Sequence, residues 1–184
     1  MDTYYRQFHL CFQRSLTVSN PLLDDLFKHV ADKVEGLYSH WFLGSLGQNW
    51  SDACADNMAE FGRVLEVPQQ VDFYRSKVSH SENRVFVIIS DAFRYEVAAS
   101  LSDQLQREMQ CKVSLESCQS IFPSVTKFGM AALLPHKKLE VVQRSNGVHG
   151  ILADGQSTEA GNRDKVLKAA HAASVALKYD NYLG

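Results

Sequence analysis

Two oxygen-bearing side chains, Asp91 and Thr126, stand where side chains can do chemistry. Asp91 directly follows an apolar run at residues 85–89 and Ser90. Thr126 stands where a loop over residues 119–125 turns into an apolar, helical pattern. If the fold brings the two together, a carboxylate can hold a divalent cation beside a hydroxyl that the cation activates as a nucleophile. The pair therefore indicates metal-assisted phosphoryl transfer.

The element that must position Asp91 is a strand over residues 84–90. Its five consecutive apolar residues are too few for a helix and fit a strand buried on both faces, as in a parallel sheet covered by helices. Ligands of such sheets bind beyond the carboxyl ends of the strands, where Asp91 falls. The alternative is that Asp91 is only the N-cap of the following helix, since Asp is a common cap.

The element that must position Thr126 is a helix of about ten residues that runs to Pro135. Free backbone N–H groups and the helix dipole make the start of a helix attractive to phosphate. Here too the alternative is capping, by Ser124 or Thr126, because both residue types are frequent N-caps. Taken together, the two residues favour a catalytic role over helix capping, because both are expected at the same edge of the sheet.

The first third of the chain predicts a helical module, residues 1–66. A long amphipathic helix opens with Asn20 as N-cap and Pro21 as its first residue. A shorter helix precedes it, another covers residues 51–61, and turns are expected at Gly44, Gly47 and Gly62. The apolar face of the long helix consists of Leu22, Leu23, Leu26, Phe27, Val30, Val34, Leu37 and Trp41.

Residues 67–83 are predicted to connect this module to a second part, residues 84–184, in which strands and helices alternate. A helix follows Asp91, and further strands are expected at residues 112–117, 139–142 and 150–153, with a final helix over residues 162–177. Alternation of this kind predicts an α/β fold: a helical N-terminal segment followed by a partial, mostly parallel sheet.

The composition predicts a cytoplasmic protein with no membrane association. The chain has 184 residues, a net charge of −2 and four cysteines without zinc-finger spacing, so we expect reduced thiols. No apolar run approaches the roughly 18 residues that span a bilayer. Met1 is not followed by a basic segment and an apolar core, so no secretory signal is expected. No basic patch marks a nucleic-acid binder by composition.

Two blocks of sequence resemble a known family. Residues 85–96, VFVIISDAFRYE, and residues 121–135, IFPSVTKFGMAALLP, closely resemble the start of the PglZ domain of bacterial BREX phage-defence systems. The resemblance continues through GILADGQST at residues 150–158 and covers about residues 67–180. It implies a domain of the alkaline phosphatase superfamily, of which residues 84–184 would be a truncated first part.

The resemblance also implies roles for both candidate residues. Asp91 corresponds to the superfamily's first-strand aspartate, a metal ligand. Thr126 corresponds to its nucleophile, which also contacts metal and forms a phospho-threonine intermediate. The implied cofactor is a divalent metal, with two zinc ions in a complete domain. The remaining Asp and His ligands are expected downstream, because no Asp-His pair occurs here. We therefore expect this chain alone to be inactive and to bind metal weakly.

At the level of function, the resemblance implies a metal-dependent phosphatase or phosphodiesterase of a BREX system. Its implied partners are other BREX components, such as the system's DNA methyltransferase, and its implied substrate is DNA or a nucleotide phosphodiester. The alternative is a structural or regulatory component that binds other proteins of the defence complex, with vestigial or no catalysis. The helical first third favours this alternative, since hydrolysis does not obviously require it.

Overall fold

The computed structural model describes residues 1–17, 20–109, 111–143 and 147–179. The chain divides into two compact units. Unit 1 comprises residues 1–65 and 92–115, and unit 2 comprises residues 66–91 and 116–184. The chain therefore leaves unit 2 directly after Asp91 and returns to it at Glu116.

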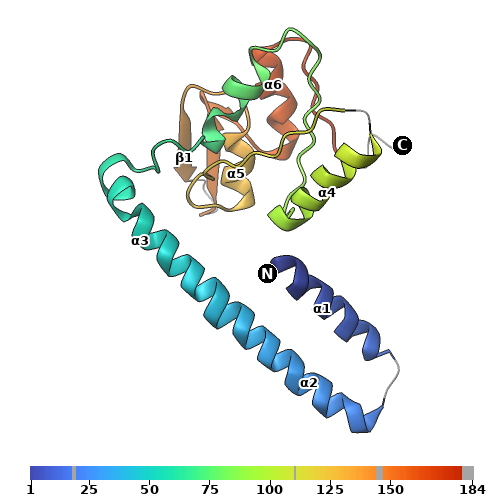
Figure 1. The fold of residues 1–184 in the computed structure, drawn as a ribbon. Coiled ribbons are helices and arrows are strands. Elements are labelled where there is room, and N and C mark those ends of the chain that lie inside the picture. Colours follow the sequence, from blue (N-terminus) through green and yellow to red (C-terminus); the bar gives the residue numbers. More distant parts are fainter. Residues whose placement is uncertain (18–19, 110, 144–146, 180–184) are drawn as a thin grey trace. The chain divides into compact units, whose positions relative to one another are not determined.

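Unit 1 is helical. Its elements are α1 (Asp2–Ser15), α2 (Pro21–Gly36), the π-helix η1 (Leu37–Leu43), α3 (Gly44–Phe61) and α4 (Tyr95–Glu108). Helices α2, η1 and α3 follow one another without a break, as Figure 1 shows. The turns expected at Gly44 and Gly47 are therefore wrong: both glycines lie inside α3, where a glycine costs about 1 kcal/mol but does not break the helix.

Two predicted helix ends are confirmed. The long helix begins at Pro21, whose fixed φ suits a first helical position. Helix α3 ends at Phe61, and its C-cap Gly62 has a left-handed φ of 65° and donates its backbone N–H to Met58 O. Several side chains predicted on the apolar face are exposed in the structure, among them Leu26 and Trp41.

Helix α1 packs along α2 and η1 through an aromatic pair. The rings of Tyr5 and Tyr38 stack with centroids 3.7 Å apart and an angle of 12° between planes. The Tyr5 hydroxyl donates a hydrogen bond to Glu35, 2.5 Å away, and this bond raises the pKa of Tyr5 above its usual value. Stacked rings and a charge-assisted bond together hold the two helices side by side.

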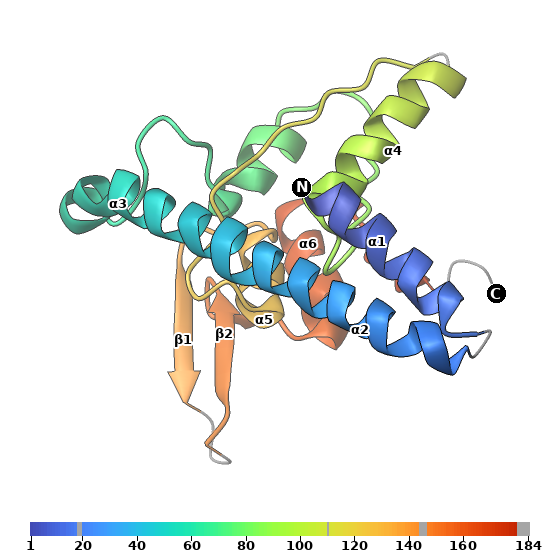
Figure 2. The ribbon, with the colours of Figure 1, turned by 60° about the horizontal axis from the view of Figure 1, so that its bottom comes forward.

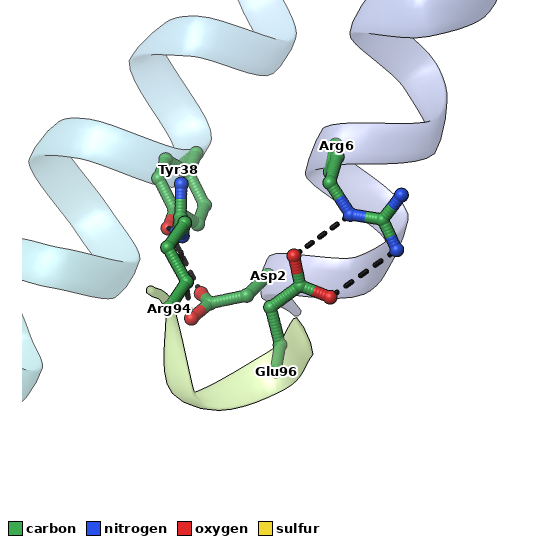
Figure 3. A network of polar contacts seen from close by, with 5 residues as sticks. All are labelled: Asp2, Arg6, Tyr38, Arg94 and Glu96. Carbon is green, nitrogen blue, oxygen red and sulfur yellow. Dashed lines mark hydrogen bonds and ion pairs between the residues drawn. The ribbon is translucent and has the colours of Figure 1, made fainter. Parts of the chain in front are cut away.

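Polar contacts attach α4 and its N-cap Arg94 to α1 and η1 (Figure 3). Arg6 donates two hydrogen bonds to Glu96, at 2.7 and 3.3 Å. Arg94 donates to the Tyr38 hydroxyl at 2.7 Å, and that hydroxyl donates to Asp2 at 2.9 Å. Only 8% of the Glu96 side chain is exposed, so Arg6 compensates a largely buried charge.

Unit 2 contains a small sheet flanked by short helices. Its strands are β1 (Leu139–Gln143), β2 (His149–Ala153) and β3 (Gln156–Ser157), in the order β1-β2-β3, with β1 and β2 side by side in Figure 2. Its helices are η2 (Gln70–Asp72), η3 (Tyr74–Val78), α5 (Thr126–Ala132), η4 (Ala160–Asn162) and α6 (Arg163–Ala170). A core cluster of Leu134, Ala153 and Val166 joins the sheet to α6.

The sheet is antiparallel, so the expectation of a mostly parallel sheet is wrong. The β1–β2 register pairs Leu139 with Ala153 and Val141 with Ile151. Residues 144–148 alone connect these two strands, whereas a parallel pair needs a crossover of roughly a dozen residues or more. The strands expected at residues 139–142 and 150–153 are themselves present.

The strands expected at residues 84–90 and 112–117 are absent. Both segments belong to no helix or strand, and within residues 84–90 Phe86 and Ile88 are 80% and 92% exposed. A strand exists only through its hydrogen bonds to a neighbour, and the described residues supply no neighbour for either segment. The final helix is also shorter than predicted and ends at Ala170.

Within the described part of the chain, no helix combines the length and the apolar character needed to cross a membrane.

Candidate functional site

The two residues expected to do chemistry contact each other in unit 2. Thr126 Oγ1 donates a hydrogen bond to Asp91 Oδ2 over 2.9 Å. Both side chains are exposed, so a substrate in solution can approach them. Asp91 directly follows the segment at residues 84–90, which is neither helix nor strand, and Thr126 is the first residue of α5. The arrangement fits a nucleophilic hydroxyl whose proton is directed at a carboxylate.

Neither residue is a helix N-cap, which removes the alternative left open by the sequence. The N-cap of α4 is Arg94, three residues beyond Asp91. The N-cap of α5 is Val125, and no side chain caps this helix. Instead the Val125 carbonyl accepts the N–H groups of Phe128 and Gly129, each at 3.0 Å. Because α5 has seven residues, its dipole adds little to this site.

The loop before Thr126 is attached to the segment at residues 68–70. Gln119 donates its N–H to Pro68 O at 2.7 Å, and its carbonyl accepts the Gln70 N–H at 2.9 Å. This forms an isolated parallel bridge between Gln69 and Gln119. The Gln70 side chain then accepts the N–H of Ile121 at 3.1 Å and donates to the carbonyl of Gly129 at 3.3 Å. One glutamine therefore contacts the chain on both sides of Thr126.

Lys127, next to the candidate nucleophile, is engaged elsewhere in unit 2. Its Nζ donates to the backbone carbonyl of His149 and lies 3.3 Å from Glu159 Oε1. The lysine therefore links the start of α5 to β2 and to the segment before α6.

Asp154, in the third block of family-like sequence, has a structural role. Its carboxylate accepts the backbone N–H groups of Lys137 and Lys138, at 2.8–3.1 Å. These two bonds hold the pKa of Asp154 below its usual value of 3.8. Asp154 and Gly155 both have left-handed φ angles, 47° and 80°, in the turn between β2 and β3. Asp154 therefore fixes the turn to the start of β1.

The donors present fit a divalent cation in kind but not in number. Asp91 and Thr126 offer a carboxylate and a hydroxyl oxygen, ligands that hard and borderline cations accept. A structural or catalytic zinc ion takes at least three protein ligands. Among residues 1–17, 20–109, 111–143 and 147–179, no group of three or more His, Cys, Asp or Glu side chains could hold a metal ion.

Comparison with known proteins identifies the family of this chain. The family model for the BREX system PglZ alkaline phosphatase-like domain matches residues 73–184. The alkaline phosphatase-like protein BrxZ of Escherichia coli O9:H4 (strain HS) is 42% identical over 150 residues, which cover 78% of this chain and 17% of that protein. The alkaline phosphatase-like protein PglZ of Bacillus cereus (strain H3081.97) is 34% identical over 182 residues, which cover 97% of this chain and 20% of that protein.

The chain therefore belongs to the PglZ family of BREX systems and carries part of its alkaline phosphatase-like domain. It spans about a fifth of the length of these two curated relatives. No solved structure matches the chain.

One residue of the site, Gln70, has no signal in the sequence. It lies in the predicted connector at residues 67–83, where polar and apolar residues alternate irregularly, and a single glutamine forms no motif. Only the long-range contacts to Ile121 and Gly129 reveal its position beside α5.

Proposed function

We propose that this chain supplies the nucleophile and one metal ligand of a PglZ-type metal-dependent phosphatase or phosphodiesterase. The observation that carries the proposal is the hydrogen bond from Thr126 Oγ1 to Asp91 Oδ2, at 2.9 Å. Two residues from the two family-like blocks meet at hydrogen-bond distance, although each stands in a different segment of unit 2. Membership of the PglZ family supports the reaction class.

The chemistry follows from these two side chains. Thr126 Oγ1 attacks phosphorus, and the hydroxyl proton leaves along its bond to Asp91. The new Oγ1–P bond forms as the ester P–O bond breaks, and the departing alkoxide takes up that proton and leaves as the alcohol. Water then cleaves the phospho-threonine and restores the hydroxyl. A divalent cation, when bound, lowers the pKa of the hydroxyl and polarises the phosphoryl oxygen. Asp91 orients the hydroxyl and would be one ligand of that cation.

The metal, the partners and the substrate belong to the same proposal. Zinc is the proposed ion, with two ions in a complete domain, and the ligands beyond Asp91 and Thr126 are proposed to lie downstream of this chain. The proposed partners are other BREX components, among them the system's DNA methyltransferase. DNA or a nucleotide phosphodiester is the proposed substrate, and the site of action is the cytoplasm. By itself the 184-residue chain is proposed to be inactive.

The test uses a longer form of the protein that includes the remaining ligands. It is assayed on a chromogenic phosphodiester and a phosphomonoester with Zn²⁺ or Mn²⁺, beside Asp91→Ala and Thr126→Ala. Arg14→Ala, an exposed change in α1, is the matched control. Hydrolysis that both site variants abolish and the control retains supports the proposal. A folded, metal-loaded protein that hydrolyses neither ester contradicts it.

A second candidate function is an interaction component of the defence complex. The observation that favours it is the exposure of large apolar side chains along α2, η1 and α3, which include Leu26, Leu37, Trp41 and Trp50. Exposed apolar side chains are typical of protein-binding surfaces where they form one continuous patch. An inert but metal-loaded protein that copurifies with other BREX components through these residues would support this function.

A further inference from the structure

We propose that Gln70 is a positioning residue that sets the orientation of the Thr126 hydroxyl toward Asp91. The inference rests on the proposed role of Thr126 as nucleophile. Gln70 touches neither Thr126 nor Asp91 through a hydrogen bond of its own, so it would act through the backbone that carries Thr126. Its two amide contacts bracket that backbone, one at Ile121 and one at Gly129.

The first contact fixes the start of the loop. Gln70 Oε1 accepts the N–H of Ile121 at 3.1 Å, five residues before Thr126. The backbone bridge between Gln69 and Gln119 supports the same point, because Gln119 exchanges hydrogen bonds with Pro68 O and Gln70 N. The loop therefore leaves residues 68–70 from a defined place and direction.

The second contact fixes the first turn of α5. Gln70 Nε2 donates to Gly129 O at 3.3 Å, and Gly129 is also the residue whose N–H bonds to Val125 O. Space at this contact is limited, since a Cβ on Gly129 would lie 3.3 Å from Gln70 Nε2. The absence of a side chain at Gly129 lets the Gln70 amide approach the helix backbone.

Local helix signals contribute little to the position of Thr126, so contacts from other segments, those of Lys127 and Gln70, must hold it. Helix α5 has seven residues, below the length at which an isolated helix is stable, and no side chain caps it. Thr126 itself is exposed. Catalysis by an oriented nucleophile is sensitive to displacements of about 1 Å, so a clamp at both ends of the loop has a direct consequence for the reaction.

Two variants separate the two contacts. Gln70→Ala removes both, whereas Gln70→Glu keeps the acceptor for Ile121 and, ionised at neutral pH, loses the donor to Gly129. The matched control is Gln69→Ala in the neighbouring residue, whose Nε2 is buried and has no hydrogen-bond partner among the described residues. If Gln70→Ala fails to fold, Gln70→Glu alone decides the question.

The first readout is nuclear magnetic resonance on the 184-residue chain. Three-bond couplings to Thr126 Cγ2 are expected to report one χ1 rotamer in the wild type and in Gln69→Ala, and averaging in both Gln70 variants. Amide exchange in α5 is expected to be about tenfold faster in Gln70→Ala. Unchanged Thr126 couplings in both Gln70 variants would overturn the inference, even if the variants unfold more easily.

The second readout is hydrolysis of the chromogenic diester by the longer, active form. Because Gln70 does not contact substrate, kcat is expected to fall about tenfold or more while KM stays unchanged. An equal rise in KM with constant kcat would overturn the positioning role. If the wild-type protein hydrolyses nothing, the proposed function fails, whereas the Thr126 couplings still decide whether Gln70 orients the hydroxyl.

Discussion

Thr126 and Asp91 are 35 positions apart in the sequence, yet the Thr126 hydroxyl donates to the Asp91 carboxylate across 2.9 Å. The contact joins the start of α5 to Asp91, which directly follows the exposed segment at residues 84–90 of unit 2. An exposed hydrogen bond of this kind adds little to the free energy of folding. Its geometry is therefore more informative about chemistry than about stability.

Two substitutions distinguish the contribution of the Thr126 hydroxyl from that of its methyl group. In the longer form of the protein, Thr126→Val is expected to lower the proposed diester hydrolysis by about a thousandfold or more, while Thr126→Ser keeps it within about tenfold. Both variants should unfold close to the wild type, because Thr126 is exposed. Equal losses in the Val and Ser variants would contradict a specific role of the hydroxyl, because Ser retains it and Val does not.

Zinc affinity of the 184-residue chain should be low. With two oxygen donors at Asp91 and Thr126, and no three-ligand cluster within the described residues, calorimetry is expected to give a Kd above about 1 µM. Asp91→Asn should weaken the residual binding further, because it removes the charged donor. Sub-micromolar binding that survives Asp91→Asn would indicate a different metal site.

The Arg6–Glu96 pair should stabilise unit 1. Arg6→Ala leaves the Glu96 carboxylate largely buried without its charged partner, and we expect unfolding to become easier by about 1–3 kcal/mol. Denaturant titration followed by tryptophan fluorescence reports this unit, since Trp41 and Trp50 both lie in it.

The control for that measurement is Arg14→Ala, which removes the same charge from an exposed position on α1. It should change the unfolding free energy by no more than about 0.5 kcal/mol. If Arg6→Ala and Arg14→Ala destabilise unit 1 equally, net charge rather than the ion pair is responsible.

Low pH should weaken the hydrogen bonds by which Asp154 holds the β2–β3 turn to Lys137 and Lys138. The folded-state pKa of Asp154 lies below its usual 3.8, so its contribution to stability is present above pH 3.8 and is lost as pH falls through the lower, folded value. The amide resonances of Lys137 and Lys138 should shift in that range and exchange faster. Asp154→Asn should abolish this dependence; if the shifts persist in that variant, another acid causes them.

Gly129 and Gln70 should be coupled energetically. With Gln70 present, Gly129→Ala gains helix propensity but pushes a Cβ to 3.3 Å from the Gln70 amide nitrogen. In a Gln70→Ala background the crowding is gone, and the same change should stabilise unit 2 by about 1 kcal/mol. A thermodynamic cycle over the two sites measures the difference, and additivity would contradict the close contact.

Local sequence was sufficient for several elements. The amphipathic spacing after Pro21, the glycine at position 62 and the pattern after Asp91 correctly indicate helices or their ends, because such signals act over one or two turns. The two short strands after residue 138 were also recognisable. The direction of these strands was not recognisable, because the periodicity shows which residues alternate and contains no information about the partner strand.

The buried strand expected at residues 84–90 shows the same limit. Five apolar residues favour an extended conformation, but pairing and burial depend on neighbours elsewhere in the chain. The described residues provide none, so Phe86 and Ile88 are exposed to solvent.

The sequence by itself determined the two side chains of the candidate site and the family, because the blocks around Asp91 and Thr126 are each continuous and local. Only the tertiary structure decided that these side chains meet, that neither is a helix cap, and that Gln70 holds the loop between them. The physical reason is that hydrogen bonds between distant segments depend on the path of the backbone between them. No local pattern of residue types specifies that path.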